Sequence, residues 1–472
     1  VSGFGRRVRA ALGLPAQRGK RIVVIIAALV LMAGAGAGGV LGTAALSGSA
    51  TVVVTTTPPP PPVLLRPALL PADGRGPAPT SAGVGAVLDP LVARGGLGAL
   101  SGQVVDSVTG TVLWQRDAAT PLVPGSTAKL LTASAALLAL DHQATLRTTV
   151  LAGAEPGTVV LVGGGDPTLS AATTTVYPGA ARLDDLAMQV KATASGPVRR
   201  VLVDVGRYSG DLLAPGWSPD DVTSGFVAPI AAVMLDGGRA DPGLAVSSRA
   251  EMPAMAAAAE LARRLGADAD AVAVASAPPG AAVLGEVVSP PVEELVALVL
   301  STSDNVLAEV LAREVARAHN AEPSFSGASR AVLQVLGEHG FDVAGVTLVD
   351  GSGLSAQNVI PARLLTEVLG AAAAPDESQR YLAALRPLLV GLPVAGGSGT
   401  LTDRYERSAT GGRGWVRAKT GTLTGVNSLA GTVLDAEGRV LVFALLSNGP
   451  DPVSVRPRLD GLAAALRSCG CR

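Results

Sequence analysis

One stretch of the chain, Leu130–Leu140, is apolar almost without interruption and constrains the fold more than any other. Only Thr132 and Ser134, both small, break its run of leucine and alanine. A helix that is apolar on nearly all sides has to be buried, so we expect the fold to surround it and leave only its N-terminal end near solvent. The Pro124-Gly125 pair just before it predicts a turn that leads into this helix.

A serine and a lysine, Ser126 and Lys129, stand at that N-terminal end. Helical spacing places residues three apart on one face. The free N–H groups and positive dipole end of a helix start favour negative charge on the serine oxygen. A neutral lysine amine can take the serine proton if burial or a second cation lowers its pKa. The alternative is that Ser126 only caps the helix and Lys129 is solvated.

Lysine usage favours the catalytic interpretation. Of the 37 basic residues only four are lysines, Lys20, Lys129, Lys191 and Lys419. Arginine cannot act as a base, because its guanidinium does not lose a proton in proteins. Lysines at 129 and 419 in a chain that otherwise uses arginine indicate that these two positions need an amine.

Charge, cysteines and histidines argue against nucleic-acid binding, a zinc site and a catalytic histidine. A formal net charge of −1 argues against binding nucleic acid through bulk positive charge. The only cysteines, Cys469 and Cys471, form no zinc pattern and are either an incidental tail or an optional disulfide. No motif flanks the three histidines, so none is a candidate catalytic base.

The N-terminal part predicts export. Residues 1–21 form a basic segment without acidic residues, and the 25 residues Ile22–Leu46 carry no charge, enough to span a bilayer as a signal anchor. A cleaved signal peptide is the competing interpretation. Residues 47–85 are rich in Pro and Thr and predict an extended linker. We therefore expect a single-pass protein of the cell membrane with an extracytoplasmic catalytic domain.

The remaining chain divides into three parts. Residues 86–145 hold the Ser126 helix, preceded by a helix over Leu88–Leu97 and a hairpin made of Ser101–Asp106 and Thr111–Gln115. Short apolar runs and a helix near Pro253–Leu265 predict an inserted α/β domain over 146–288. In 289–472 we expect two helices that meet at Ser303-Asp304-Asn305, followed by a strand at Val346–Val349 and a helix from Pro361. A three-stranded meander whose first strand carries Lys419 and a final helix over Val453–Leu466 complete this part.

Three short motifs therefore occur in order, each in a definite setting. Ser126-Thr127-Ala128-Lys129 opens a buried helix, Ser303-Asp304-Asn305 joins two helices, and Lys419-Thr420-Gly421 lies on a strand, where glycine allows close approach to the backbone. This is the motif set of penicillin-binding proteins and class A β-lactamases. A single Ser-x-x-Lys is weak evidence, but three ordered motifs are strong evidence.

More narrowly, the chain resembles the class C low-molecular-weight penicillin-binding proteins, the D-alanyl-D-alanine carboxypeptidase/endopeptidases of peptidase family S13. The resemblance also rests on Gly163–Thr168, on Asp350–Ser355 and on the long insert between the first two motifs. It implies an α+β fold of the penicillin-binding protein and serine β-lactamase type. That fold has an antiparallel sheet with helices on both faces and an all-helical part, here with an inserted domain and an N-terminal transmembrane helix.

The resemblance also implies a function. Ser126 would attack the penultimate D-alanine of a peptidoglycan stem peptide that ends in D-Ala-D-Ala, and β-lactams would acylate the same serine. Lys129 would be the base, Ser303 a proton relay and Asn305 a partner of Lys129 and of the substrate amide. Lys419 would keep Lys129 neutral and attract the substrate carboxylate, and the hydroxyls of Thr420 and Thr422 would bind that carboxylate. Gly421 would let the substrate approach the backbone, and the N–H groups of Ser126 and Thr422 would bind the oxyanion. No cofactor or metal is implied. A serine β-lactamase and a non-catalytic wall-binding module are the alternatives.

Overall fold

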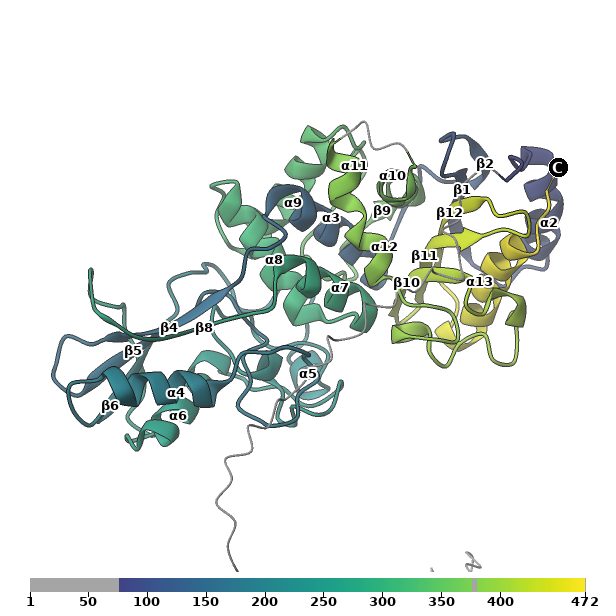
Figure 1. The fold of residues 1–472 in the computed structure, drawn as a ribbon. Coiled ribbons are helices and arrows are strands. Elements are labelled where there is room, and N and C mark those ends of the chain that lie inside the picture. Colours follow the sequence, from purple (N-terminus) through teal and green to yellow (C-terminus); the bar gives the residue numbers. More distant parts are fainter. Residues whose placement is uncertain (1–75, 376–379, 472) are drawn as a thin grey trace, which may run out of the picture. The chain divides into compact units, whose positions relative to one another are not determined.

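The structure is a computed structural model that describes residues 76–375 and 380–471. Its first sheet has five antiparallel strands in the order β10-β11-β12-β1-β2 (Figure 1). These strands are β1 (Ala99–Asp106), β2 (Val112–Arg116), β10 (Val416–Leu423), β11 (Val426–Leu434) and β12 (Val440–Asn448). Strands from the two ends of the described chain thus meet in the middle of one sheet, where Ala99 lies opposite Asn448. The predicted hairpin and the predicted meander are both confirmed.

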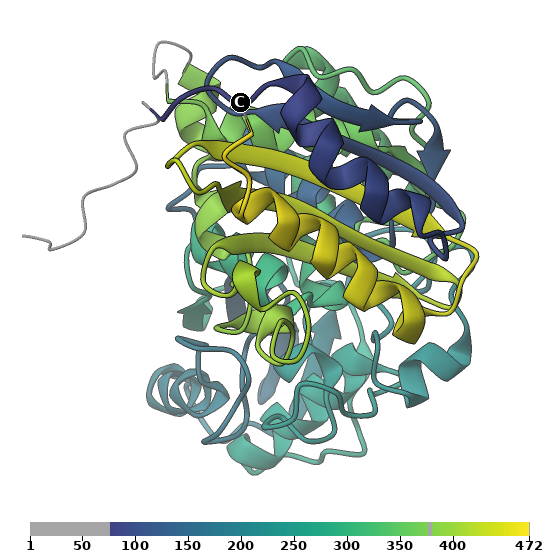
Figure 2. The same ribbon diagram turned by 90° about the vertical axis from the view of Figure 1, so that its right-hand side faces the viewer.

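Helices cover both faces of this sheet. On one face lie α2 (Ser81–Ala93) and α13 (Pro452–Arg467), which pack against each other and against β2 and β11 (Figure 2). On the other face, α10 (Ala362–Ala373) packs against β1, β11 and β12. The apolar side chains that alternate along the strands are buried in both directions, as in Phe443 and Val442. This part matches the expected antiparallel sheet with helices on both faces.

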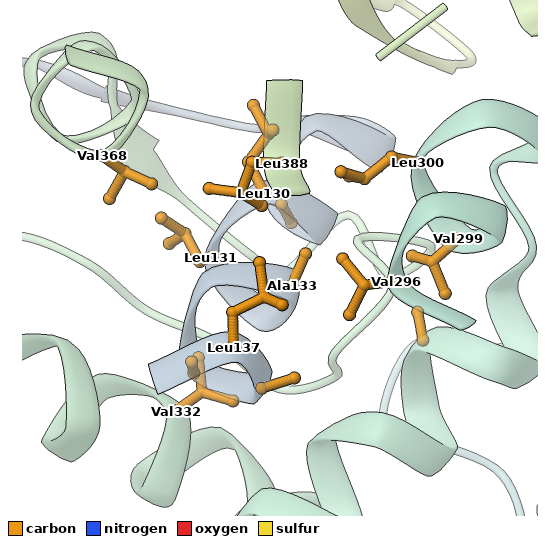
Figure 3. Close-up of a cluster of buried hydrophobic side chains, with 14 of the residues drawn as sticks. Leu130, Leu131, Ala133, Leu137, Val296, Val299, Leu300, Val332, Val368 and Leu388 are labelled. Atoms are coloured by element: carbon orange, nitrogen blue, oxygen red, sulfur yellow. The ribbon is translucent and has the colours of Figure 1, made fainter. Parts of the chain in front are cut away.

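A helical part surrounds α3 (Lys129–Ala139), the helix predicted to be buried. The helices around it are α7 (Val292–Thr302), α8 (Asn305–Ala318), α9 (Phe325–Glu338), α11 (Arg380–Leu385) and α12 (Pro387–Gly391), together with α10. Figure 3 shows Leu130, Leu131 and Leu137 of α3 among side chains of these helices. Each buried leucine contributes about 1.5–3 kcal/mol by leaving water. The burial fixes the position and direction of α3.

A second, mixed sheet has the order β7-β6-β5-β4-β8. Its strands are β4 (Arg147–Ala152), β5 (Thr158–Val162), β6 (Arg200–Asp204), β7 (Ala273–Val274) and β8 (Val283–Val288). Strands β5, β6 and β7 are parallel, whereas β4 pairs antiparallel with β5 and β8. Two helices, α4 (Leu183–Thr193) and α6 (Pro253–Leu265), pack on this sheet, and the short α5 (Pro219–Thr223) lies on a long excursion between β6 and β7. A second hydrophobic core fills this unit and extends to Val306 of α8 and Phe325 of α9.

Short elements complete the fold. A two-residue ladder pairs β3 (Pro121–Leu122) with β9 (Ile360–Pro361). Four 3₁₀ turns are η1 (Gly125–Ala128), η2 (Asp236–Gly238), η3 (Gly399–Leu401) and η4 (Thr410–Gly412). The C-terminal cysteines are paired as a disulfide, with Cα atoms 4.9 Å apart. Thr80 N–H donates to the Cys471 carbonyl oxygen at 2.6 Å, so this tail packs against the start of α2.

Several predicted elements differ from those observed. The helix expected over Leu88–Leu97 runs from Ser81 to Ala93, because Thr80 caps its N-terminus and left-handed glycines follow its end. The predicted strand Val346–Val349 is wrong: it forms a single bridge from Thr347 to Val359, since no partner strand runs along it. The predicted anchor Ile22–Leu46 lies outside the described residues. Within 76–375 and 380–471, no helix is long and apolar enough to cross a bilayer.

Candidate active site

Ser126 lies in the turn η1, directly before α3, rather than in the helix itself. This turn is tied to strand β11: Ser428 Oγ donates to the Pro124 carbonyl oxygen at 2.5 Å, and Thr127 Oγ1 donates to the same oxygen at 2.8 Å. Lys129 is the first residue of α3 and is fully buried. The turn and helix therefore hold the serine at the surface of the core and the lysine beneath it.

Lys129 Nζ contacts three oxygens. It lies 2.6 Å from Asn305 Oδ1, 2.7 Å from the Ser352 carbonyl oxygen and 3.0 Å from Ser126 Oγ. A carbonyl oxygen can only accept a hydrogen bond, whereas a hydroxyl can also donate one. A neutral amine has two N–H donors and one lone pair. In the neutral amine, Asn305 and Ser352 would accept both N–H donors, and the lone pair would then face the hydroxyl of Ser126.

Burial makes the neutral form of Lys129 more accessible than in a solvated lysine. Burial lowers the pKa of Lys129 to about 8, although the charges of Asp350, Glu309 and Asp304 raise it. The second lysine, Lys419, is also fully buried. Its pKa is lowered well below the ordinary range by burial and by the charge of Lys129. A protonated Lys129 thus opposes the protonation of Lys419.

The loop between α7 and α8 carries the second motif. Ser303 has a left-handed conformation, with φ 63°, and ends α7. Asp304, not Ser303, is the N-cap of α8, because its Oδ1 accepts the Leu307 N–H at 2.9 Å. Ser303 Oγ is therefore free of capping and accepts from Lys419 Nζ at 2.8 Å. The motif therefore contacts both lysines: Lys419 through Ser303, and Lys129 through Asn305.

The third motif lies on β10, as predicted. The close approach at Gly421 is made by the chain itself: a Cβ there would overlap the Pro124 carbonyl oxygen and lie 3.0 Å from Ser126 N. Thr422 and Ser126 both line a cavity of about 700 Å³. The hydroxyl of Thr420 pairs with Thr400 Oγ1 at 2.8 Å. The eight residues proposed from the sequence therefore lie on three segments that meet at Ser126.

A fourth segment, Asp350–Ser355, completes the site. The Ser352 carbonyl oxygen of this segment accepts a hydrogen bond from Lys129 Nζ. The N–H groups of Gly351 and Ser352 donate to the Glu309 carboxylate at 3.0 and 2.7 Å. Gly353 has φ +76°, and a Cβ there would overlap the Gly125 carbonyl oxygen beside Ser126. Burial and the charge of Asp350 raise the pKa of Glu309. The sequence singled out this segment without a role, and nothing in it set Glu309 apart from Arg313, Glu314 and Arg317, the other charged residues of α8.

Other lining residues of the cavity also escaped the sequence analysis. Asp221 and Phe226 come from the long excursion of the second sheet, and Asp451 and Arg456 come from the start of α13. The Phe226 side chain is 52% exposed. Within the described parts of the chain, no three His, Cys, Asp or Glu side chains gather as they would around a metal ion.

Comparison with known proteins identifies the family of this chain. Residues 84–251 and 239–468 match the model of the D-Ala-D-Ala carboxypeptidase 3 (S13) family. A carboxypeptidase of Mycobacterium tuberculosis is 48% identical over 414 residues, 86% of this chain and 88% of that protein. A D-alanyl-D-alanine carboxypeptidase of an Actinomadura species is 30% identical over 459 residues, 78% of this chain and 81% of that protein.

A solved structure shares the fold. Penicillin-binding protein 4 of Haemophilus influenzae superposes with a TM-score of 0.66 at 22% identity, over 80% of this chain and 97% of that one. The family match spans the three motifs and the segment Asp350–Ser355. The chain belongs to the D-Ala-D-Ala carboxypeptidase 3 (S13) family of peptidases.

Proposed function

We propose that this chain is a serine-type D-Ala-D-Ala carboxypeptidase that acts on peptidoglycan stem peptides through an acyl-enzyme on Ser126. The observation that carries the proposal is the contact of Lys129 Nζ with Ser126 Oγ at 3.0 Å, with both amine donors held by other oxygens. A base so oriented can take the hydroxyl proton without moving.

The reaction follows from this arrangement. Lys129 takes the proton of Ser126 as Oγ bonds to the carbonyl carbon of the penultimate D-alanine. The N–H groups of Ser126 and Thr422 stabilise the oxyanion, a contribution of about 3 kcal/mol per donor. The C–N bond then breaks, and the proton reaches the leaving amine through Ser303. Water hydrolyses the ester and frees Ser126.

Binding of the substrate uses the same residues. Burial opposes the charge of Lys419, and a bound terminal carboxylate favours it, so Lys419 supplies positive potential once the substrate is in place. Thr420 and Thr422 supply hydroxyl donors to the same carboxylate. The Asn305 amide binds the substrate backbone as well as Lys129. If the leaving amine belongs to a second stem peptide, the same steps cut a cross-link, so we propose DD-endopeptidase activity as well. β-Lactams are covalent inhibitors in this scheme, and the β-lactam complex of H. influenzae penicillin-binding protein 4 supports that part.

Labelling with a fluorescent penicillin tests the proposal. We expect the full chain to form a stable adduct and the Ser126→Ala variant to form none. Rapid consumption of the antibiotic without a stable adduct would instead identify a β-lactamase. Absence of both labelling and consumption would identify a non-catalytic wall-binding module.

We also propose that Ile22–Leu46 anchors the protein in the cell membrane with the catalytic part outside. The uncharged length of this segment and the basic residues before it support the proposal. Membrane fractionation and protease treatment of intact cells test it. Protein found in the soluble fraction of the medium would contradict a retained anchor.

A further inference from the structure

The loop Ser303–Asn305 is held by residues of the second-sheet unit. We infer that Arg239 and Tyr177 of that unit are positioning residues for acylation, because they fix Asp304 and thereby the two catalytic side chains beside it. The inference rests on the proposed acyl-enzyme on Ser126.

Asp304 is the point of attachment. Its Oδ2 accepts from Arg239 Nη2 at 2.9 Å and from the Tyr177 hydroxyl at 2.8 Å, while its Oδ1 caps α8. Arg239 Nη1 donates to the Tyr177 oxygen at 2.7 Å, so the three groups form a closed triangle. The side chains of Arg239 and Asp304 are only 5% and 2% exposed. Charged groups so buried keep one geometry, since breaking their contacts leaves a charge without solvent.

The electrostatics agree with a permanent ion pair. Burial raises the pKa of Asp304, but the charges of Arg239 and Arg249 outweigh this effect and lower it to about 2. The Arg239 guanidinium also lies 4.9 Å from the ring centroid of Tyr177. Asp304 therefore remains charged and attached throughout the neutral pH range.

The same unit fixes Asn305 from the other side. Asn305 Nδ2 donates to the Phe226 carbonyl oxygen at 2.9 Å. A carbonyl only accepts, so this contact determines which end of the amide turns toward Lys129: Oδ1 does, at 2.6 Å. Arg249 Nε donates to the adjacent Gly225 carbonyl at 3.1 Å and holds that peptide in place.

These contacts control the catalytic geometry because the conformation of Ser303 depends on its surroundings. Ser303 is held left-handed between two helices, a conformation that costs a non-glycine residue free energy unless its surroundings impose it. Asp304 is its direct neighbour in the chain. Loss of the Arg239 contact would let the loop relax and move Ser303 away from Lys419 and Asn305 away from Lys129. A shift of about 1 Å in a catalytic group can cost roughly a hundredfold in rate.

A second ion pair between the same units gives a matched control. Arg207, which follows β6, donates to the Glu314 carboxylate near the other end of α8, at 2.5 and 2.9 Å. It joins the second-sheet unit to the same helix but contacts no residue of the loop. Arg207→Ala therefore removes an ion pair on the same helix, with a more exposed arginine, without touching Asp304.

The experiment measures the rate constant of acylation by fluorescent penicillin for the protein that can be labelled. The final labelled fraction gives the amount of active protein, and the melting temperature gives its stability. Arg239→Ala should label fully but about tenfold to a hundredfold more slowly, and added guanidinium ion should restore part of the rate. Tyr177→Phe should slow acylation less, because Arg239 still reaches Asp304. Arg207→Ala should lower the melting temperature and leave the rate constant within about twofold of the parent.

The outcomes separate the possible explanations. An unchanged rate constant in Arg239→Ala, or an equal slowing in Arg207→Ala, overturns the inference. If Arg239→Ala does not fold, Arg239→Lys and Tyr177→Phe decide: rate constants equal to that of the parent overturn it. A parent chain that does not label at all overturns the proposed function, whereas a labelling parent with unaffected variants overturns only this inference.

Discussion

The pH dependence of acylation gives a direct test of Lys129 as the base. Burial lowers its pKa to about 8 against the opposing charges of Asp350, Glu309 and Asp304. A base works only when it is neutral, so the rate should rise with pH until the lysine has lost its proton. Glu309, with its raised pKa, and Lys419, with its lowered pKa, belong to the same cluster of ionisable side chains. The midpoint of the pH–rate curve therefore describes the cluster rather than Lys129 alone.

The expected magnitude follows from this value. With a pKa of about 8, roughly one lysine in a hundred is neutral at pH 6 and about half at pH 8, so the rate constant should rise about fiftyfold. Above pH 9 it should rise less than about twofold. At the ordinary lysine pKa of 10.5, only about one in three thousand would be neutral at pH 7. The lowered pKa thus increases the neutral fraction of Lys129 at pH 7 by about three hundredfold.

The assay is the second-order rate constant for labelling by fluorescent penicillin between pH 6 and 9.5. Lys129→Arg is the control: a guanidinium keeps the charge but cannot accept the proton, so this variant should not label at any of these pH values. A change of less than about threefold between pH 6 and 8 would refute the assignment of the base. Labelling of the arginine variant at the parental rate would refute it as well.

Three further predictions concern the packing and the ion pairs of the fold. Gly421→Ala should nearly abolish labelling and cost about 1–3 kcal/mol of stability, because its Cβ would overlap the Pro124 carbonyl; normal labelling would contradict this packing. Leu131→Ala, in the core around α3, should cost about 2–5 kcal/mol in denaturant unfolding, and a loss below this range would show that the core refills the space. Arg439→Ala leaves the Asp106 carboxylate, at 2.7 and 2.9 Å from the guanidinium, without this partner and should cost about 3–5 kcal/mol. Burial opposes the charged form of Asp106, yet its hydrogen bonds and the charge of Arg439 lower its pKa below the ordinary value of 3.8. The ion pair therefore stabilises the parent above pH 3.8, and this stabilisation is lost as the pH falls through the pKa of Asp106 in the folded state. An equal loss of stability at low pH in the parent and in Arg439→Ala would contradict this.

Several features of the site could be predicted because they depend on local sequence. An apolar run such as Leu130–Leu140 requires burial wherever the rest of the chain goes, and it placed α3 correctly. The alternation and turns around Lys419 predicted β10 and the two strands that follow it, β11 and β12, as an antiparallel meander. The scarcity of lysine indicated that Lys129 and Lys419 share a chemical requirement, and both are fully buried.

Other features could not be predicted, because a strand or a cap depends on partners elsewhere. Val346–Val349 has the composition of a strand, but only Thr347 finds a bridging partner. Ser303 and Asp304 are both good N-caps by residue type, and the left-handed turn at Ser303 gives that role to Asp304.

The sequence by itself determined the chemical groups, their order and the elements that carry them, because helix and strand periodicity and residue chemistry are local properties. Only the tertiary structure decided what holds those groups in place. The Ser352 carbonyl on Lys129 and the Arg239 guanidinium on Asp304 join residues 223 and 65 positions apart. Such contacts leave no periodic trace in the sequence, because they form only after packing brings distant segments together and removes water from between them.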